Sequence, residues 1–163
     1  MRALFPASFD PVTNGHMDIL DRVARVFDSV VAGVVDNARA GNLFTARERV
    51  ELLQSAVAHL DNVEACLYTG LTVDFARQVN ASVLVRGLRA VSDFEYEFAL
   101  SAMNRRLYPD IDTMFFLSAP EHAFVSSSLI REIGALGRSV EPFVPPNVNS
   151  AICEKFAPVA DRR

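Results

Sequence analysis

The 163-residue chain contains no tryptophan, only two cysteines and a single lysine, Lys155, against fifteen arginines. The scarcity of lysine argues against a Schiff-base mechanism. It also means that any phosphate must be held mainly by guanidinium groups, which bind phosphate oxygens in pairs. Cys66 and Cys153 are far apart and lack the spacing of zinc ligands. We therefore expect reduced cysteines and no structural zinc site.

The sequence also lacks an excess of positive charge and a long apolar run. Its formal net charge is -4 and its pI is near 5.3, which argues against a protein that binds duplex nucleic acid through a basic face. Its longest apolar run, from Val30 to Val35, is far shorter than the about 20 residues that span a bilayer. We expect a cytoplasmic protein that binds neither nucleic acid nor a membrane. A small anionic ligand held by local arginines is compatible with these values.

Low-complexity linkers and internal repeats are absent as well. Half of the residues are hydrophobic and 22% are charged, which supplies enough apolar material for a core. A chain of this length usually forms one domain. We expect a single domain over residues 1–163, with a helical extension at its C-terminus over about residues 146–158.

Short apolar runs alternate with segments of helical periodicity along the chain. They predict strands at residues 2–6, 30–35, 63–68, 82–85 and 113–117, and helices at 15–27, 45–59, 71–79, 93–107, 126–136 and one ending at 156. In the first helix, the residues expected to face inward are Ile19, Leu20, Val23 and Val26. The alternation predicts an α/β fold, a doubly wound, five-stranded parallel sheet with helices on both faces. Ligands of such a Rossmann-like sheet lie beyond the carboxyl ends of its strands.

The first strand-to-helix loop, Pro6 to His16, is the richest in groups that could bind an anion. Ser8 supplies a hydroxyl, Gly15 permits close backbone approach and His16 brings an imidazole to a helix N-terminus, where free N–H groups favour an anion. The chain has neither a G-x-G-x-x-G nor a G-x-x-x-x-G-K-[ST] sequence, so phosphates must be held otherwise. The alternative is a capped turn with a packed histidine.

Two later segments reach the same edge of the predicted sheet. After the fourth strand, Arg86 and Arg89 flank Gly87, and two guanidinium groups there suit two phosphates, although a solvated pair is the alternative. The segment Phe124 to Arg131 places three serines at the start of a helix. Their hydroxyls could cradle an oxyanion, or serve only as helix caps.

Together these segments carry a family resemblance. Thr13-Asn14-Gly15-His16 resembles the [HT]-x-G-H motif of the nucleotidyltransferase superfamily, and Ser126 to Arg131 resembles its I-S-S-[ST]-x-x-[RK] motif. With Phe9-Asp10-Pro11, Arg86-Gly87-Leu88-Arg89 and Asp93-Phe94-Glu95-Tyr96-Glu97, the chain resembles the phosphopantetheine adenylyltransferase family over nearly its whole length.

The resemblance implies an activity and partners. The activity is transfer of AMP from ATP to the phosphate of 4'-phosphopantetheine by in-line attack on the α-phosphate, giving dephospho-coenzyme A and pyrophosphate with Mg²⁺ present. An acceptor phosphate that is ionised at neutral pH needs no general base, so alignment and charge stabilisation suffice. No ligand cluster for Mg²⁺ is recognisable in the sequence, so the ion would be held by ATP phosphates and water. The resemblance also implies a homohexamer and feedback binding of coenzyme A.

The resemblance assigns roles to individual residues as well. His16 would stabilise the transition state, Ser8 would bond where nucleophile and nucleotide meet, and Arg89 and Ser127 would hold the outgoing phosphates. The positions that match ATP contacts are Ser8, Phe9, His16, Gly87, Leu88, Arg89, Glu97, His122, Ala123, Phe124, Val125, Ser126, Ser127 and Ser128. Among them, Glu97 would accept hydrogen bonds from ribose hydroxyls. Those that match acceptor contacts are Ser8, Thr72, Arg86, Met103 and Asn104. For Met103, core packing is an equal explanation.

Two positions depart from the family pattern. Ala40 stands where the family usually has a lysine that contacts phosphate, and our hypothesis is that the adjacent Arg39 supplies the missing charge to the acceptor. His122 stands where a large aromatic residue often lies near the adenine, so stacking there would be weaker and dependent on pH. His59, at a predicted helix end, is expected to be structural.

Three alternatives stay open at this point. The superfamily motifs alone do not define the acceptor, which could be nicotinate mononucleotide, or glycerol 3-phosphate with CTP as donor. A regulator that kept the fold and binds nucleotides without catalysis is a second reading, which the missing lysine favours and an intact His16 with Ser8 opposes. A pure interaction module is the third, and it would not need polar loops at the strand ends.

Overall fold

The computed structural model describes residues 1–36 and 41–157. Its strands are β1 (Arg2–Ala7), β2 (Ser29–Val35), β3 (Val63–Tyr68), β4 (Val83–Leu88) and β5 (Asp112–Leu117). Its α-helices are α1 (Asn14–Ala24), α2 (Ala46–Ala56), α3 (Thr72–Gln78), α4 (Val91–Leu107), α5 (Ser127–Ala135) and α6 (Pro146–Phe156). Short 3₁₀ turns span Pro120–His122 and Glu141–Phe143. The elements alternate as the sequence predicts.

The strands form one parallel sheet in the order β3-β2-β1-β4-β5. Chain order reverses between β1 and β4, which pair through Ala3 with Val83 and Leu4 with Leu84. In open α/β sheets, a ligand crevice forms beyond the carboxyl ends of the strands at such a reversal. The predicted doubly wound α/β fold is therefore confirmed, and it places the crevice between the ends of β1 and β4.

Apolar side chains pack against both faces of the sheet. Along β1, Ala3 and Phe5 join a core cluster that includes residues of α1, α5 and α6, whereas Leu4 joins a second cluster with Phe75 of α3. Alternate residues of a strand point to opposite faces, so a strand covered on both sides must be apolar throughout. This explains why the inner strands read as continuous apolar runs.

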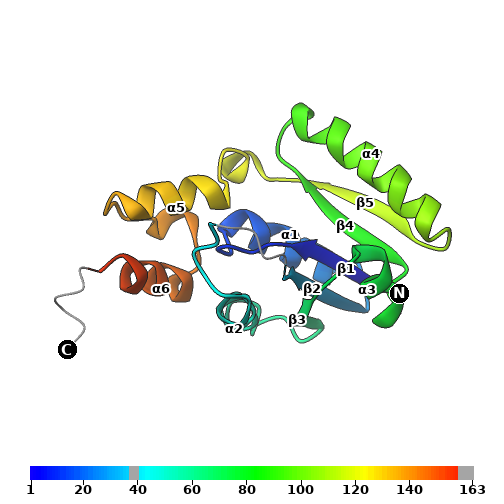
Figure 1. Cartoon of the computed structure of the whole chain (residues 1–163), viewed down its shortest axis with the longest axis horizontal. Helices are drawn as coiled ribbons and strands as arrows, with labels where there is room; N and C mark the ends of the chain where they lie inside the picture. The colour runs from blue at the N-terminus through cyan, green and yellow to red at the C-terminus, as the bar shows by residue number, and fades with distance from the viewer. Residues whose placement is uncertain (37–40, 158–163) are drawn as a thin grey trace.

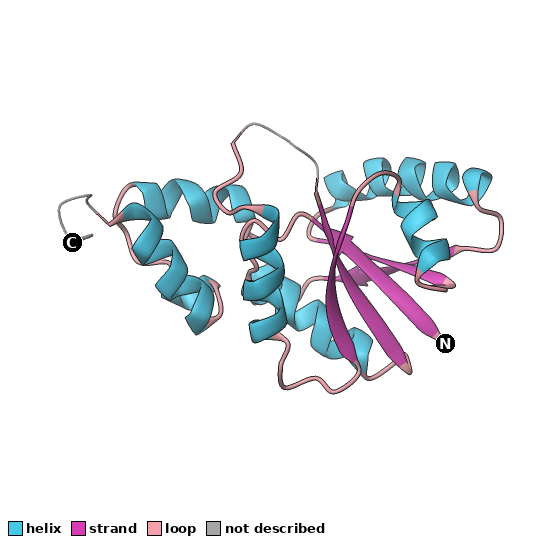
Figure 2. Ribbon diagram, turned by 60° about the horizontal axis from the view of Figure 1, so that its bottom comes forward, coloured by secondary structure: helices cyan, strands magenta, loops and turns pink. Residues whose placement is uncertain are grey.

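Helices α5 and α6 lie side by side beyond the end of the sheet where β1 ends (Figures 1 and 2). Gly134 of α5 permits this close approach, because a Cβ there would lie 2.9 Å from Cγ2 of Ile152 and 3.1 Å from the ring of Phe156 on α6. Ile130 and Ile152 are buried in the same core cluster. The packing holds the N-terminus of α5 toward the crevice.

The structure corrects three expectations. Helix α1 ends at Ala24, with Arg25 as its C-cap, so Val26 lies beyond the helix and is 62% exposed instead of facing inward. Strand β4 continues to Leu88, so Gly87 lies in the strand and not in a loop, and a Cβ there would come within 2.6 Å of Ile19 on α1. Met103 on α4 is 60% exposed, which rules out core packing as its role within the chain.

None of the described helices is long and apolar enough to cross a bilayer.

Candidate active site

A cavity of about 450 Å³ lies at the carboxyl ends of β1 and β4. Its walls come from the ends of these strands, the N-termini of α1 and α5, and the segment after β5. The residues that line it are Phe5, Pro6, Ala7, Thr13, Gly15, His16, Ile19, Arg86, Gly87, Arg89, Ser118, His122, Val125, Ser126, Ser127 and Ser128. No carboxylate of the described residues lines the cavity. Two helix N-termini and two arginines make it a site for anions.

His16 is oriented by the cap of its own helix. Thr13 is the N-cap of α1, and His16 occupies the third helical position. The Thr13 backbone N–H donates to His16 Nδ1 at 3.1 Å, while the His16 backbone N–H donates to Thr13 Oγ1 at 3.4 Å. Because Nδ1 accepts a hydrogen bond, the neutral ring carries its proton on Nε2. His16 is thus held as an Nε2–H donor at the cavity wall.

The environment of His16 keeps the ring neutral. Its ring centroid lies 5.0 Å from that of Phe9 and 6.3 Å from that of Phe5. Burial lowers the pKa of His16 from 6.5 to about 4, and the positive charge of Arg89 also lowers it. A ring with this pKa is uncharged at pH 7, so it can donate one hydrogen bond to an anion without acting as a cation.

Arg86 is tied to a buried carboxylate. Its Nε lies 2.7 Å from Oε2 of Glu97 and its Nη2 lies 2.5 Å from Oε1, while Nη1 donates to the Pro6 carbonyl at 2.9 Å. Both oxygens of Glu97, a largely buried residue of α4, are therefore engaged by Arg86. Glu97 is not among the residues that line the cavity, and the ribose contact that the resemblance implies stays a prediction.

Arg89 follows β4 and is more exposed than Arg86. Its backbone N–H donates to Oδ2 of Asp93 at 3.1 Å, and its Nε lies 3.4 Å from the same oxygen. Arg89 lines the cavity, and its positive charge lowers the pKa of His16. The two guanidinium groups thus sit at one strand end, as the sequence predicts.

The serine segment begins α5 at the opposite wall. Ser126 is the N-cap and accepts from the Leu129 N–H at 3.2 Å, and Ser127 Oγ donates to the Pro11 carbonyl at 2.8 Å. The capping interpretation of the serines is therefore correct for Ser126. All three serines nevertheless line the cavity, so the segment that caps α5 also forms part of the cavity wall.

Several residues expected at the site lie outside the cavity lining. Phe9 and Leu88 are buried in the fold, Ser8 is exposed, and Phe124 is 62% exposed and packs edge to face on Phe143. The others that do not line it are Ala123, Glu97, Thr72, Met103 and Asn104. The Thr72 hydroxyl lies 3.0 Å from that of Tyr68. Arg39 and Ala40 are outside the described residues.

Sequence reasoning did not assign a role to Thr13 or Ser118, both of which line the cavity. Thr13 was only part of a motif, yet it orients His16. Ser118 comes directly after β5, so the rule that ligands lie at strand ends could have found it. Ile19 is buried in the core, as the sequence predicts, and it also lines the cavity beside Gly87.

The fold and the cavity define an α/β protein with a crevice at the reversal of its sheet, lined by two arginines and the N-termini of two helices. The chain belongs to the cytidylyltransferase-like family, whose model matches residues 4–133, a stretch that contains both motifs around His16 and Ser126. It is therefore a nucleotidyltransferase. A Vibrio parahaemolyticus protein described as a nicotinate-nucleotide adenylyltransferase shares the fold, with a TM-score of 0.70 and 19% sequence identity over 93% of this chain and 97% of the other.

Proposed function

We propose that this nucleotidyltransferase transfers AMP from ATP to 4'-phosphopantetheine, giving dephospho-coenzyme A and pyrophosphate. The observation that carries the chemical step is the Nε2–H of His16, fixed by Thr13 and opposed across one cavity by Arg86, Arg89 and the start of α5. The acceptor is supported by the family resemblance of the arginine segment and of Asp93 to Glu97.

In the proposed reaction, an oxygen of the acceptor phosphate attacks the α-phosphorus of ATP. The new bond joins that oxygen to the α-phosphorus, and the bond from the α-phosphorus to the bridging oxygen of the β-phosphate breaks, so the electron pair leaves with pyrophosphate. The neutral His16 donates its Nε2–H to an α-phosphate oxygen as charge develops. Arg89 and Ser127 hold the leaving phosphates, and Arg86 holds the acceptor phosphate. No proton has to be removed from the nucleophile.

Mg²⁺ would enter with ATP in the proposed reaction. The described residues place no group of three or more His, Cys, Asp or Glu side chains where it could hold a metal ion. Mg²⁺ prefers oxygen ligands and commonly keeps substrate phosphates and several waters. The chain would therefore bind the Mg·ATP complex through its phosphates, and coenzyme A, which resembles the product, would compete for the same cavity.

Pyrophosphate release with Mg·ATP tests the proposal when 4'-phosphopantetheine, nicotinate mononucleotide and glycerol 3-phosphate are compared, with CTP as the alternative donor. Release with ATP and 4'-phosphopantetheine alone supports it. Release only with another acceptor would contradict the proposed acceptor, and the protein would still be a nucleotidyltransferase. The hypothesis for Arg39 is checked in the same assay, because an Arg39→Ala variant with unchanged turnover and substrate affinity would contradict it.

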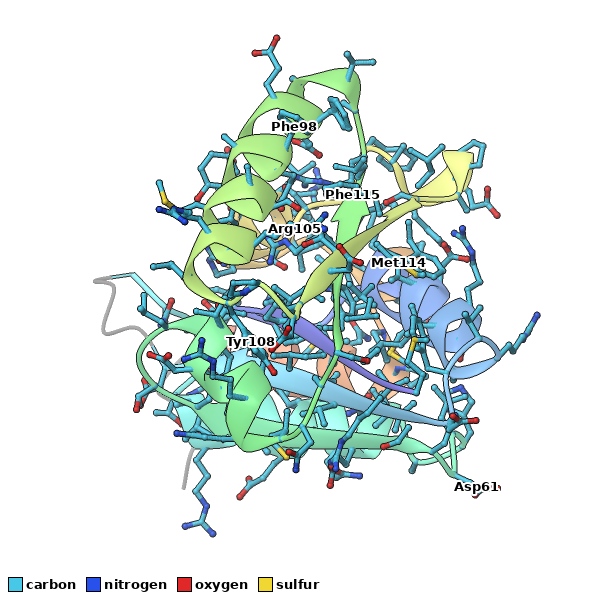
Figure 3. All side chains as sticks on the ribbon, turned by 90° about the vertical axis from the view of Figure 1, so that its right-hand side faces the viewer. Asp61, Phe98, Arg105, Tyr108, Met114 and Phe115 are labelled. Carbon is cyan, nitrogen blue, oxygen red and sulfur yellow. The ribbon has the colours of Figure 1, made fainter. Side chains whose placement is uncertain are left out.

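We also propose that the chain associates with copies of itself through α4 and β5. These two elements, seen from the side in Figure 3, expose several large apolar side chains, namely Tyr96, Phe98, Met103, Leu107, Met114 and Leu117. Strand β5 is an edge of the sheet. Exposed apolar patches beside an open strand edge are typical of interfaces.

Charge on α4 favours a second copy as the occupant of this surface. The first turns of the helix carry Asp93, which pairs with Arg89 of the same chain, and Glu95, and its last turn carries Arg105, which pairs with Asp112, and Arg106. Two copies of α4 that lie antiparallel would bring the acidic start of one helix to the basic end of the other, with apolar side chains between them. We propose this arrangement as one contact within the homohexamer that the resemblance implies.

A further inference from the structure

Three carbonyl groups of the loop between β1 and α1 are each held by a side chain from a distant helix. Arg49 Nη1 of α2 donates to the Ser8 carbonyl at 2.7 Å, and Ser127 Oγ of α5 donates to the Pro11 carbonyl at 2.8 Å. Between them, Nη1 of Arg131 on α5 donates to the Asp10 carbonyl. The loop that precedes His16 is thus fixed from two sides.

The carboxylate of Asp10 is the centre of this arrangement. It is 1% exposed, and it accepts from the backbone N–H groups of Leu43 and Phe44 at 2.9 Å each. Nη1 of Arg131 lies 3.4 Å from its Oδ2. A buried carboxylate is tolerated only with such partners, because the loss of hydration costs several kcal/mol otherwise. Asp10 therefore joins its own loop to the segment before α2 and to α5.

Arg49 makes the second buried link. Its side chain is 1% exposed, and Nη1 also donates to the Val35 carbonyl at the end of β2, at 3.0 Å. Among the described residues, its Nε has no hydrogen-bond partner. Burying a guanidinium with an unsatisfied N–H lowers the stability of the fold. The Arg49 side chain nevertheless fixes the ends of β1 and β2 relative to α2.

None of the side chains of Asp10, Arg49 and Arg131 lines the cavity. They act on the loop, and the loop ends at Thr13, whose backbone N–H sets the tautomer and direction of His16. The reaction rate depends strongly on the alignment of a donor with the reacting phosphate, since a displacement of about 1 Å can lower the rate about 100-fold. A side chain that moves Thr13 would therefore change catalysis without touching substrate.

We propose that Asp10 is a positioning residue for nucleotidyl transfer, acting with Arg131 and Arg49 to fix the loop that orients His16. The inference rests on nucleotidyl transfer and not on the identity of the acceptor. It also gives the last residue of the serine motif, Arg131, a role in holding the loop.

The first test is Asp10→Asn, which keeps the shape of the side chain but removes its charge and turns an amide NH₂ toward one of the two backbone N–H groups. We expect kcat to fall about 10- to 100-fold while KM for ATP stays within about threefold, because the lost alignment matters in the transition state. Rates are taken per folded molecule, with the folded fraction measured by circular dichroism at the assay temperature.

The second test uses Arg131. Arg131→Met should lower kcat in the same way, and Arg131→Lys, which keeps a positive charge near Asp10, should recover part of the loss. Arg138→Met, at an exposed arginine shortly after α5, is the matched control and should keep wild-type kcat. The double variant Asp10→Asn/Arg131→Met should lose little more than the worse single variant, because both changes break one arrangement.

Turnover per folded molecule within about twofold of wild type in Asp10→Asn or in Arg131→Met would overturn the proposal. So would a loss of activity that only follows the loss of folded protein. If wild type transfers no nucleotide to any acceptor, the proposed function fails and the positioning role is still decided by NMR of the His16 ring nitrogens. Loss of the Nε2–H tautomer in Asp10→Asn supports it, and an unchanged tautomer contradicts it.

Discussion

The backbone N–H of Thr13 and Nδ1 of His16 are joined by a 3.1 Å hydrogen bond, which makes a helix cap and a candidate catalytic donor into one unit. Of the two interpretations that the sequence leaves open, the structure confirms the capped turn with a packed histidine, and the phosphate site stays a prediction. Its Nδ1 belongs to the cap, and its Nε2–H is left for the cavity.

Replacing His16 should remove the donor that acts in the transition state. We expect His16→Ala to lower kcat by about 100-fold or more, with a small change in melting temperature. His59→Ala is the control, because His59 is exposed and its Nε2 pairs with Asp21 away from the cavity. Steady-state kinetics of the two variants decide the matter, and wild-type turnover in His16→Ala would refute the role.

The lowered pKa of His16 has a consequence for stability. Since the folded chain binds this proton only near pH 4 and the unfolded chain binds it near pH 6.5, the unfolded state holds more protons between these values. The contribution of neutral His16 to stability is therefore present above pH 6.5 and is lost as the pH falls toward 4.

Urea unfolding at about pH 7 and about pH 5 measures this effect. Wild type should lose more free energy of unfolding over this interval than His16→Gln, whose side chain does not titrate. An NMR titration of the His16 ring gives the pKa directly. A midpoint near 6.5 in the folded protein, or equal losses in the two proteins, would contradict the prediction.

The Glu97 carboxylate has two candidate roles, holding Arg86 or contacting the ribose of ATP, and a Glu97 variant distinguishes them. If Glu97 holds Arg86 for the acceptor phosphate, Glu97→Gln should lower kcat/KM for the acceptor about tenfold and leave KM for ATP unchanged. If Glu97 instead contacts the ribose, as the resemblance implies, KM for ATP should rise. The two Michaelis constants of this one variant distinguish the roles.

Self-association should depend on the apolar surface of α4. Phe98→Asp places a charge on a residue that is 60% exposed in the single chain, and we expect it to weaken association by about tenfold or more. Val26→Asp, at a similarly exposed position beyond α1, is the control. Light scattering after size-exclusion chromatography should give a smaller mass for Phe98→Asp only. Equal masses for wild type and both variants would place the interface elsewhere.

Much of the fold is readable from the sequence because its signals are local. The inner strands β1 and β2 are largely apolar on both faces, and Thr45 followed three residues later by Glu48 is a sequence pattern typical of the capping box that begins α2. The end of β4 was missed because Gly87 looks like a loop residue, whereas it lies in the strand with no room for a Cβ beside Ile19. The end of α1 was missed because Val26 continues the apolar period.

The part of the site that faces the cavity was also predictable, since strand ends and motifs identify His16, Arg86 and Arg89. The arrangement behind it was not. Asp10 contacts a backbone N–H 34 positions away and an arginine 121 positions away, and no local pattern connects residues at such separations. Only the folded chain shows that Glu97 is bound to Arg86.

The most direct test of the account uses 4'-phosphopantetheine whose phosphate carries ¹⁸O, incubated with Mg·ATP and the wild-type protein. If an acceptor oxygen attacks the α-phosphorus, mass spectrometry will find every labelled oxygen in dephospho-coenzyme A and none in pyrophosphate. Absence of a labelled dephospho-coenzyme A product, or ¹⁸O in pyrophosphate, would contradict transfer of AMP to the acceptor phosphate.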